Sequence, residues 1–420
     1  MGASFATFYT RYPLIGWTRR IAGRKLDASE TLEGTMNASL MRARGPGEHA
    51  KVGFVELFFD LVFVFAITQV SHLLLGRLTP MGALEAAILL AAVWWVWIDT
   101  SWITNWLDPE RGPVRLMLFG LMAAGLIMST SLPEAFGDKG LVFACAFASI
   151  QVGRSLFTLW AVRGSAVQKA NFQRISAWAL LGAVFWISGG LAEGQTRLLI
   201  WLVALVLEFT APAVAFFVPG LGRSITTDWD VEGAHLAERV GLFVIICLGE
   251  SIVITGATFA DLAWTPPVVV AFASALTTAI TMWWLFFNEA HEAAAETFVH
   301  AADPGAIARR VYTYCPIIVV AGIVVTAVGD ELALAHPMGP TAVATAAVLL
   351  GGPLLFLLGT SLSILAIWGK VAWPRVAGIG LLGLAALASP LLPPLALTLM
   401  STAVLVLTAI WESVAGRRSA

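Results

Sequence analysis

The chain has 420 residues, of which 58% are hydrophobic and only 12% are charged, and its formal net charge is −2. Soluble domains are about 25% charged, so this composition, with a mean hydropathy of +0.82, excludes a soluble globular protein. A nearly neutral chain also lacks the basic surplus of a nucleic-acid-binding protein.

Residues 1–51 are predicted to form a basic N-terminal tail on the cytoplasmic side of a membrane. The tail contains eight lysines and arginines but no sustained apolar run. Because a signal peptide requires such a run, we do not interpret the tail as a targeting segment.

Beyond the tail, apolar stretches long enough to cross a bilayer follow one another. A transmembrane helix needs about 20 such residues, and connectors rich in Pro, Gly and charge separate the stretches. We predict an all-α integral membrane protein with about 12 transmembrane helices, ten or eleven being compatible with the pattern. The predicted spans are residues 52–76, 81–106, 114–132, 140–162, 175–192, 197–219, 236–259, 266–288, 311–329, 342–368, 375–390 and 394–412.

The distribution of positive charge predicts the orientation of these helices. With the N-terminus in the cytoplasm, 20 lysines and arginines fall on the cytoplasmic side and three on the other. This asymmetry is typical of membrane proteins. We therefore expect both termini in the cytoplasm, including a short C-terminal tail at residues 413–420.

The spans also suggest an internal duplication, with one six-helix repeat at residues 52–219 and a second at residues 236–412. Trp94-Trp95, followed by Asp99, matches Trp283-Trp284, followed by Asn288, at a constant offset of 189 residues. Chance similarity between apolar helices is the alternative interpretation. Two copies of six helices would share one orientation and be related by a pseudo-two-fold axis along the membrane normal. A transport pathway is then expected at their interface.

Ionisable residues within the spans are the candidate functional residues, because each costs roughly 2.5–3.5 kcal/mol to insert at the bilayer centre. Glu56 and Asp60 lie one turn apart on the first span. Such a pair either shares a proton or holds a cation or an arginine; a simple helix-end pair is the alternative. The tryptophans near Asp99 are interpreted as an interfacial belt rather than a ligand-stacking surface.

Arg154 and Gln151 belong to one polar stripe on the fourth span. An arginine keeps its charge in proteins, so Arg154 near the middle of the membrane requires an acidic partner. Glu250 on the seventh span is the expected partner, with Asp60 and Glu208 as competitors.

Two further groups lie toward the cytoplasmic side. Glu238 and its neighbour Arg239 are expected to form an interfacial ion pair. A loop contains acidic residues and histidines, but their spacing fits no standard metal-ligand pattern. We therefore interpret it as solvated and predict neither a metal nor a cofactor. Its residues are Glu289, His291, Glu292, Glu296, His300 and Asp303.

Several motifs carry a family resemblance. They are Val55–Ile67, Trp94-Trp95, His235 to Arg239 with Leu248 to Ser251, and Ala321 to Asp330. In these stretches the sequence resembles the bacterial low temperature requirement protein A family, over roughly residues 50–400. The resemblance implies a multi-pass protein of the bacterial cytoplasmic (inner) membrane that is associated with growth in the cold. It implies no particular biochemical activity.

A weaker likeness concerns Phe58-Phe59-Asp60. It is similar to the Phe-Ser-Asp motif on the pore-lining helices of the lysosomal-type potassium channel family, which also has two six-helix repeats. Here Phe59 replaces the serine and the second copy has no such motif, so the likeness does not extend to a symmetric pore.

These features predict a secondary transporter or channel whose path is lined by the first, fourth and seventh spans. The expected partners are the lipid bilayer and a small ion or solute, with no nucleic acid; association into a homo-oligomer is left open. The alternative is a membrane-embedded enzyme or lipid-handling protein, with a non-enzymatic function favoured. The predicted pathway residues are Glu56, Asp60, Asp99, Gln151, Arg154, Glu208, Glu238, Arg239, Glu250, Ser251 and Asn288.

Overall fold

Twelve α-helices make up nearly all the regular structure of the described residues, which are 40–42, 51–224, 231–288 and 309–419 of the computed structural model. This confirms the prediction of an all-α protein. The helices are α2 (Phe54–Gly76), α3 (Pro80–Trp106), α4 (Gly112–Ser131), α5 (Gly140–Ala161), α6 (Ala166–Leu191), α7 (Gly194–Thr210), α8 (Gly233–Asp261), α9 (Pro266–Phe287), α12 (Cys315–Ala335), α13 (Val343–Trp368), α14 (Trp373–Ala388) and α15 (Pro394–Ser419).

Eleven helices in the described part of the chain are long and apolar enough to cross a membrane. Their outward faces expose large aliphatic side chains, as lipid contact requires. Val184, for example, is 61% exposed, Val253 is 64% exposed and Leu387 is 79% exposed. Exposed apolar surface on this scale marks a membrane-facing protein, which agrees with the predicted multi-pass architecture.

Local sequence determines where several helices begin and end. Pro80 and Pro266 occupy first helical positions, where the missing amide hydrogen has no cost. The Thr79 hydroxyl accepts a hydrogen bond from Gly82 N at 3.0 Å and caps α3. At the other end of a helix, Gly369 closes α13 with a φ of 63°, a conformation that favours glycine.

The twelfth helix, α7, differs from its prediction. A span was expected over residues 197–219, but α7 ends at Thr210 after 17 residues. Pro212 has no amide hydrogen to donate to the Glu208 carbonyl, so the helical hydrogen bonding cannot continue. The chain instead turns through Ala215 and Phe216, whose φ angles are 57° and 50°.

Other helix ends in the structure also differ from the predicted boundaries. α6 begins at Ala166, nine residues before the predicted span, because the Ser165 hydroxyl caps a polar first turn. α15 continues to Ser419, so most of the predicted tail at residues 413–420 is helical. Residues 1–39 and 43–50 of the basic tail and the loop from Glu289 to Asp303 lie outside the described residues.

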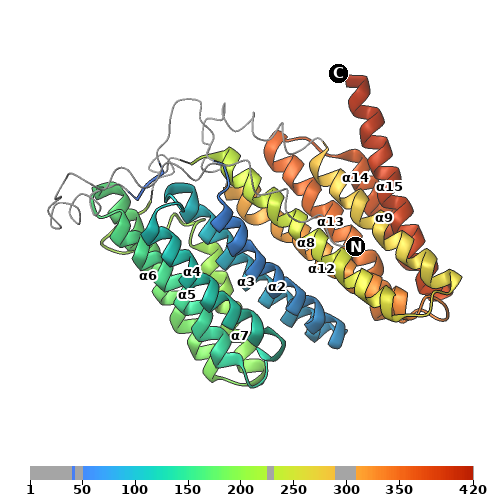
Figure 1. The fold of residues 1–420 in the computed structure, drawn as a ribbon, viewed down its shortest axis with the longest axis horizontal. Helices are drawn as coiled ribbons and strands as arrows, with labels where there is room; N and C mark the ends of the chain where they lie inside the picture. The colour runs from blue at the N-terminus through green and yellow to red at the C-terminus, as the bar shows by residue number, and fades with distance from the viewer. Residues whose placement is uncertain (1–39, 43–50, 225–230, 289–308, 420) are drawn as a thin grey trace, which may run out of the picture. The chain divides into compact units, whose positions relative to one another are not determined.

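Contacts between the two halves of the chain involve α2 and α3 from the first half and α8 and α12 from the second. Figure 1 shows α4–α7 on one side of these helices and α9 with α13–α15 on the other. α2 packs against α3 and α4, and α8 packs in the same way against α9 and α12. The predicted duplication is compatible with this arrangement and stays a prediction.

Glycines bring the backbones of α12 and α13 close together. A Cβ atom on Gly322 would lie 2.5 Å from Phe356 N, and one on Gly352 would lie 2.5 Å from Thr326 N. Real Cβ atoms do not approach backbone atoms so closely. Small residues at such crossings are a common way to pack membrane helices, because the backbones can then touch.

Candidate functional site: two buried polar clusters

Two groups of buried charged side chains contain most of the predicted charged residues. The first, which we call the sealed cluster, lies between α2, α3 and α8 and contains Arg42, Glu56, Asp60, His235 and Arg239. The second, which we call the Asp99 pocket, is a cavity whose charged side chains are Asp99, Arg154 and Arg309.

In the sealed cluster, Arg239 holds two carboxylates of α2. Its Nη2 donates to Asp60 Oδ1 at 2.8 Å, and its Nη1 lies 3.4 Å from Glu56 Oε1. Trp97 Nε1 also donates to Asp60 Oδ1, at 2.7 Å. Asp60 and Glu56 are 0% exposed and Arg239 is 1% exposed. The geometry supports the arginine-holding role for the Glu56–Asp60 pair.

A second arginine completes the charge balance of this cluster. Arg42 Nη2 donates to Glu56 Oε2 at 2.8 Å, and His235 Nε2 lies 3.1 Å from Glu56 Oε1. Two guanidinium groups thus face two carboxylates. A buried charge is tolerated only when it is paired in this way, so we interpret the sealed cluster as a structural joint between α2 and α8.

The expected pairing of Glu238 with Arg239 is wrong. Adjacent residues on a helix point in different directions and do not face each other. Arg239 points into the interface with α2, while Glu238 Oε2 accepts a hydrogen bond from Val52 N at 3.4 Å.

In the Asp99 pocket, Arg154 is anchored by side chains and backbone of α3. Its Nη2 donates to Asp99 Oδ2 at 3.1 Å and to Gln151 Oε1. Its Nη1 donates to Val96 O at 3.1 Å and to Thr100 Oγ1 at 3.0 Å. Arg154 is only 3% exposed, and these hydrogen bonds compensate its charge in the place of water.

The prediction that Glu250 pairs with Arg154 is therefore wrong. α5 packs against α3, whereas Glu250 on α8 accepts a hydrogen bond from Thr68 Oγ1 on α2 at 2.6 Å. A signal for the true partner was present in the sequence. Asp99 and Arg154 each lie seven residues before the end of helices that run in the same direction, so they share one depth.

The floor of the pocket links α3, α5 and α7. Gln151 Nε2 lies 3.3 Å from both Asp99 Oδ2 and Glu208 Oε2, and Trp95 Nε1 donates to Glu208 Oε2 at 3.0 Å. The other oxygen of Glu208 is buried and has no hydrogen-bond partner among the described residues.

Aromatic side chains fill the space beyond this floor. Phe147, one turn before Gln151 on α5, packs on Trp186 with ring centroids 4.4 Å apart. Phe143 and Trp201 belong to the same group, and all four side chains are fully buried. The pocket is therefore closed toward the end of the bundle at which α2 finishes.

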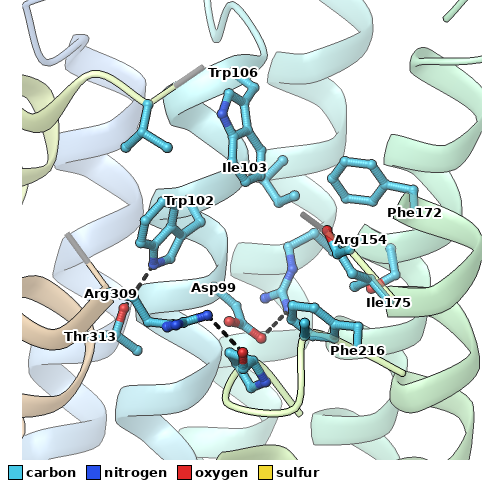
Figure 2. Close-up of a pocket in the computed structure, with 15 residues that line it drawn as sticks. Asp99, Trp102, Ile103, Trp106, Arg154, Phe172, Ile175, Phe216, Arg309 and Thr313 are labelled. Atoms are coloured by element: carbon cyan, nitrogen blue, oxygen red, sulfur yellow. Dashed lines mark hydrogen bonds and ion pairs between the residues drawn. The ribbon is translucent and has the colours of Figure 1, made fainter. Parts of the chain in front are cut away.

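The cavity itself has a volume of about 130 Å³. Figure 2 shows Asp99 between Arg309 and Arg154, with a dashed line that joins Asp99 to Arg154; all three side chains line the cavity. Four of the residues that line it are aromatic, and one of these is fixed by a hydrogen bond from Trp102 Nε1 to Thr313 Oγ1 at 2.9 Å. The aromatic wall residues are Trp102, Trp106, Phe172 and Phe216.

Two irregular segments shape the rim of the pocket. A π-helical turn, η3 (Arg309–Tyr314), precedes α12, and such turns are frequent at functional sites. The loop after α7 supplies Phe216 in its left-handed conformation. Arg309 Nη1 donates to Pro212 O at 2.7 Å and joins the two segments. Sequence reasoning placed Arg309 in a cytoplasmic loop and did not identify Phe172 or Phe216.

The two tryptophan pairs have different environments. Trp94 and Trp95 are 1% and 2% exposed, whereas Trp283 and Trp284 are 44% and 43% exposed. The interfacial-belt interpretation is therefore wrong for the first pair, and Trp102 and Trp106, on the same helix, line the pocket.

The remaining predicted residues lie away from the pocket. Asn288 is exposed at the end of α9. Ser251 lines a separate cavity of about 20 Å³ between α8 and α9. Within the described ranges, no group of three or more His, Cys, Asp or Glu side chains could hold a metal ion.

Comparisons with known proteins agree with the motifs. A family model described as bacterial low temperature requirement A protein matches residues 51–410. An uncharacterised protein of Rhizobium meliloti (strain 1021) is 42% identical over 377 residues, which cover 88% of this chain and 90% of the relative. No solved structure matches the chain. The family match includes every residue that lines the Asp99 pocket.

Proposed function

The chain belongs to the bacterial low temperature requirement A family, and we propose that it is a secondary transporter that binds a small solute in the Asp99 pocket. The observation that carries this proposal is the exposure of the Asp99 carboxylate. The Asp99 side chain is 30% exposed and faces the cavity, although the side chain of its partner Arg154 is only 4% exposed.

The sealed cluster provides the comparison within the same protein. There the carboxylates of Glu56 and Asp60 are both 0% exposed, as expected of groups that only join helices. A charge within a membrane helix that faces a cavity instead marks a substrate or ion pathway. The difference between Asp60 and Asp99 supports a binding role for Asp99 and a structural role for Asp60.

The closure of the pocket at one end supports transport rather than simple binding. The cavity is lined at its rim by Trp106, Val231 and Arg309, which lie at the end of the bundle where α2 begins. The positive-inside pattern supports a cytoplasmic location for this end, and we propose that the membrane is the bacterial cytoplasmic (inner) membrane. Hydrogen bonds from Trp95 and Gln151 to Glu208 close the other end, and movement of α7 away from α3 would open it.

Solute uptake by proteoliposomes tests the proposal. Radiolabelled rubidium, choline, benzoate and L-leucine represent a cation, an organic cation, an organic anion and a zwitterion. We expect uptake of at least one probe by the wild-type protein. Asp99→Asn should lower its initial rate about tenfold or more, because a hydrogen bond to a charged group contributes roughly 1.5–3 kcal/mol.

Asp108→Asn is the matched control, because Asp108 pairs with Arg111 in an exposed connector outside the pocket. This variant should transport at the wild-type rate. Equal uptake by Asp99→Asn and Asp108→Asn, or no uptake of any probe by the wild-type protein, would contradict the proposal.

A further inference from the structure

The Asp99 pocket presents one acidic and one basic group that do not neutralise each other. Asp99 Oδ2 accepts hydrogen bonds from Arg154 Nη2 and Gln151 Nε2, while Asp99 Oδ1 has no hydrogen-bond partner among the described residues. Arg309 uses one nitrogen for the Pro212 carbonyl. Both residues line the cavity, and the ion pair of Asp99 is with Arg154 and not with Arg309 (Figure 2).

Charged groups of both signs line the cavity, the acidic Asp99 and the basic Arg154 and Arg309. Arg154 is already paired with Asp99 Oδ2, which leaves Asp99 Oδ1 and Arg309 to face a ligand. A ligand that is only a cation or only an anion would leave one of these two groups without a partner in a poorly solvated site. A zwitterion would not, because its ammonium and carboxylate groups can face Asp99 and Arg309 separately.

The remaining walls define the rest of the ligand. Trp102, Trp106, Phe172 and Phe216 form an aromatic enclosure, which favours an apolar body that buries its surface against the rings. The cavity of about 130 Å³ is several times the roughly 30 Å³ that one water molecule occupies in the liquid, so it is large enough for a small organic molecule and not only for a single ion.

We infer that the Asp99 pocket binds a free amino acid with a large apolar side chain, with the ammonium group on Asp99 Oδ1 and the carboxylate on Arg309. The inference rests on the proposed function only in taking this pocket as the solute site. Each charged group of the ligand then has one protein partner, and the aromatic rings contact the side chain.

Binding to the detergent-purified full chain tests the inference independently of transport. Isothermal titration compares L-leucine with isoamylamine, which lacks the carboxylate, and with 4-methylpentanoate, which lacks the ammonium group. We expect leucine to bind about tenfold to a hundredfold more tightly than either analogue, as expected for the loss of one charged hydrogen bond. Similar affinities for all three compounds would overturn the inference.

Two variants assign the two ends of the ligand. Arg309→Gln should remove the preference for leucine over isoamylamine and keep the preference over 4-methylpentanoate. Asp99→Asn should do the reverse. Arg111→Gln and Asp108→Asn, which alter an exposed pair away from the pocket, should change neither. If Asp99→Asn fails to fold because Arg154 loses its partner, the same three compounds titrated into the wild-type protein and into Arg309→Gln still test whether the pocket binds both charged groups of leucine.

A lipid headgroup is the other source of a zwitterion. Glycerophosphoethanolamine, the soluble headgroup of phosphatidylethanolamine, is therefore titrated as a competitor. Tighter binding of this compound than of leucine would overturn the assignment to an amino acid. Leucine binding without uptake would contradict the transporter and keep the inference, whereas uptake of another probe without leucine binding would contradict the inference alone.

Discussion

Replacing Arg239 with glutamine is expected to destabilise the protein by roughly 3–5 kcal/mol, the usual cost of breaking a buried ion pair by removing one partner. Arg239 is the only described arginine that contacts Asp60, which is completely buried. Arg42 would still neutralise Glu56, so the variant leaves one uncompensated negative charge between α2 and α8. The fraction of monodisperse protein after heating, followed by size-exclusion chromatography, measures the effect.

A second substitution separates lost charge balance from lost packing. Arg239→Gln combined with Asp60→Asn removes one charge of each sign and should recover much of the stability. Arg111→Gln is the matched control, because Arg111 is 47% exposed in its ion pair with Asp108. If the double variant is no more stable than Arg239→Gln alone, the charge-balance argument for the sealed cluster is wrong.

Gly352→Ala is the second substitution with a large expected effect. The added methyl group would lie 2.5 Å from Thr326 N, which is backbone and cannot rotate away. α12 and α13 must then move apart along their contact. Overpacking in a core costs typically 1–3 kcal/mol, and we expect the upper end of this range in the same heating assay.

The adjacent residue provides the control for this experiment. A Cβ atom on Gly351 meets nothing within 4 Å, although both glycines belong to α13. Alanine is better than glycine within a helix by about 1 kcal/mol, so Gly351→Ala should be neutral or stabilising. Equal effects of the two substitutions would show that the close contact with α12 does not determine stability.

The membrane-spanning helices could be predicted from the sequence because each is a long apolar run bounded by Pro, Gly or charge. Apolar length, however, does not show where a helix stops if the following loop is also apolar. This is why the span expected at residues 197–219 became a helix ending at Thr210. The first turns of α6 were missed because they are polar, and an apolar run does not show where a helix begins if its first turns are polar.

Partners within the site were harder to predict than site residues. Asp99 and Arg154 were both identified as candidates, since charge inside a span is conspicuous, but their pairing depends on which helices are neighbours. That α3 and not α8 packs against α5 is a property of the assembled bundle. Arg309 was assigned to a loop because only the π-helical turn brings it to the cavity.

The short length of α7 has a consequence for the surrounding lipid. Its 17 residues give about 26 Å of helix, less than the hydrocarbon thickness of about 30 Å. The bilayer beside α7 must therefore thin, or the loop that follows must enter hydrocarbon, where free carbonyl groups are costly. Two loop carbonyls are already satisfied from α6, Phe217 O by Trp178 and Leu221 O by Arg174. The mismatch between helix length and membrane thickness therefore affects the loop after α7, which carries Phe216. A change in membrane thickness would thus act on the shape of the pocket rim through α7.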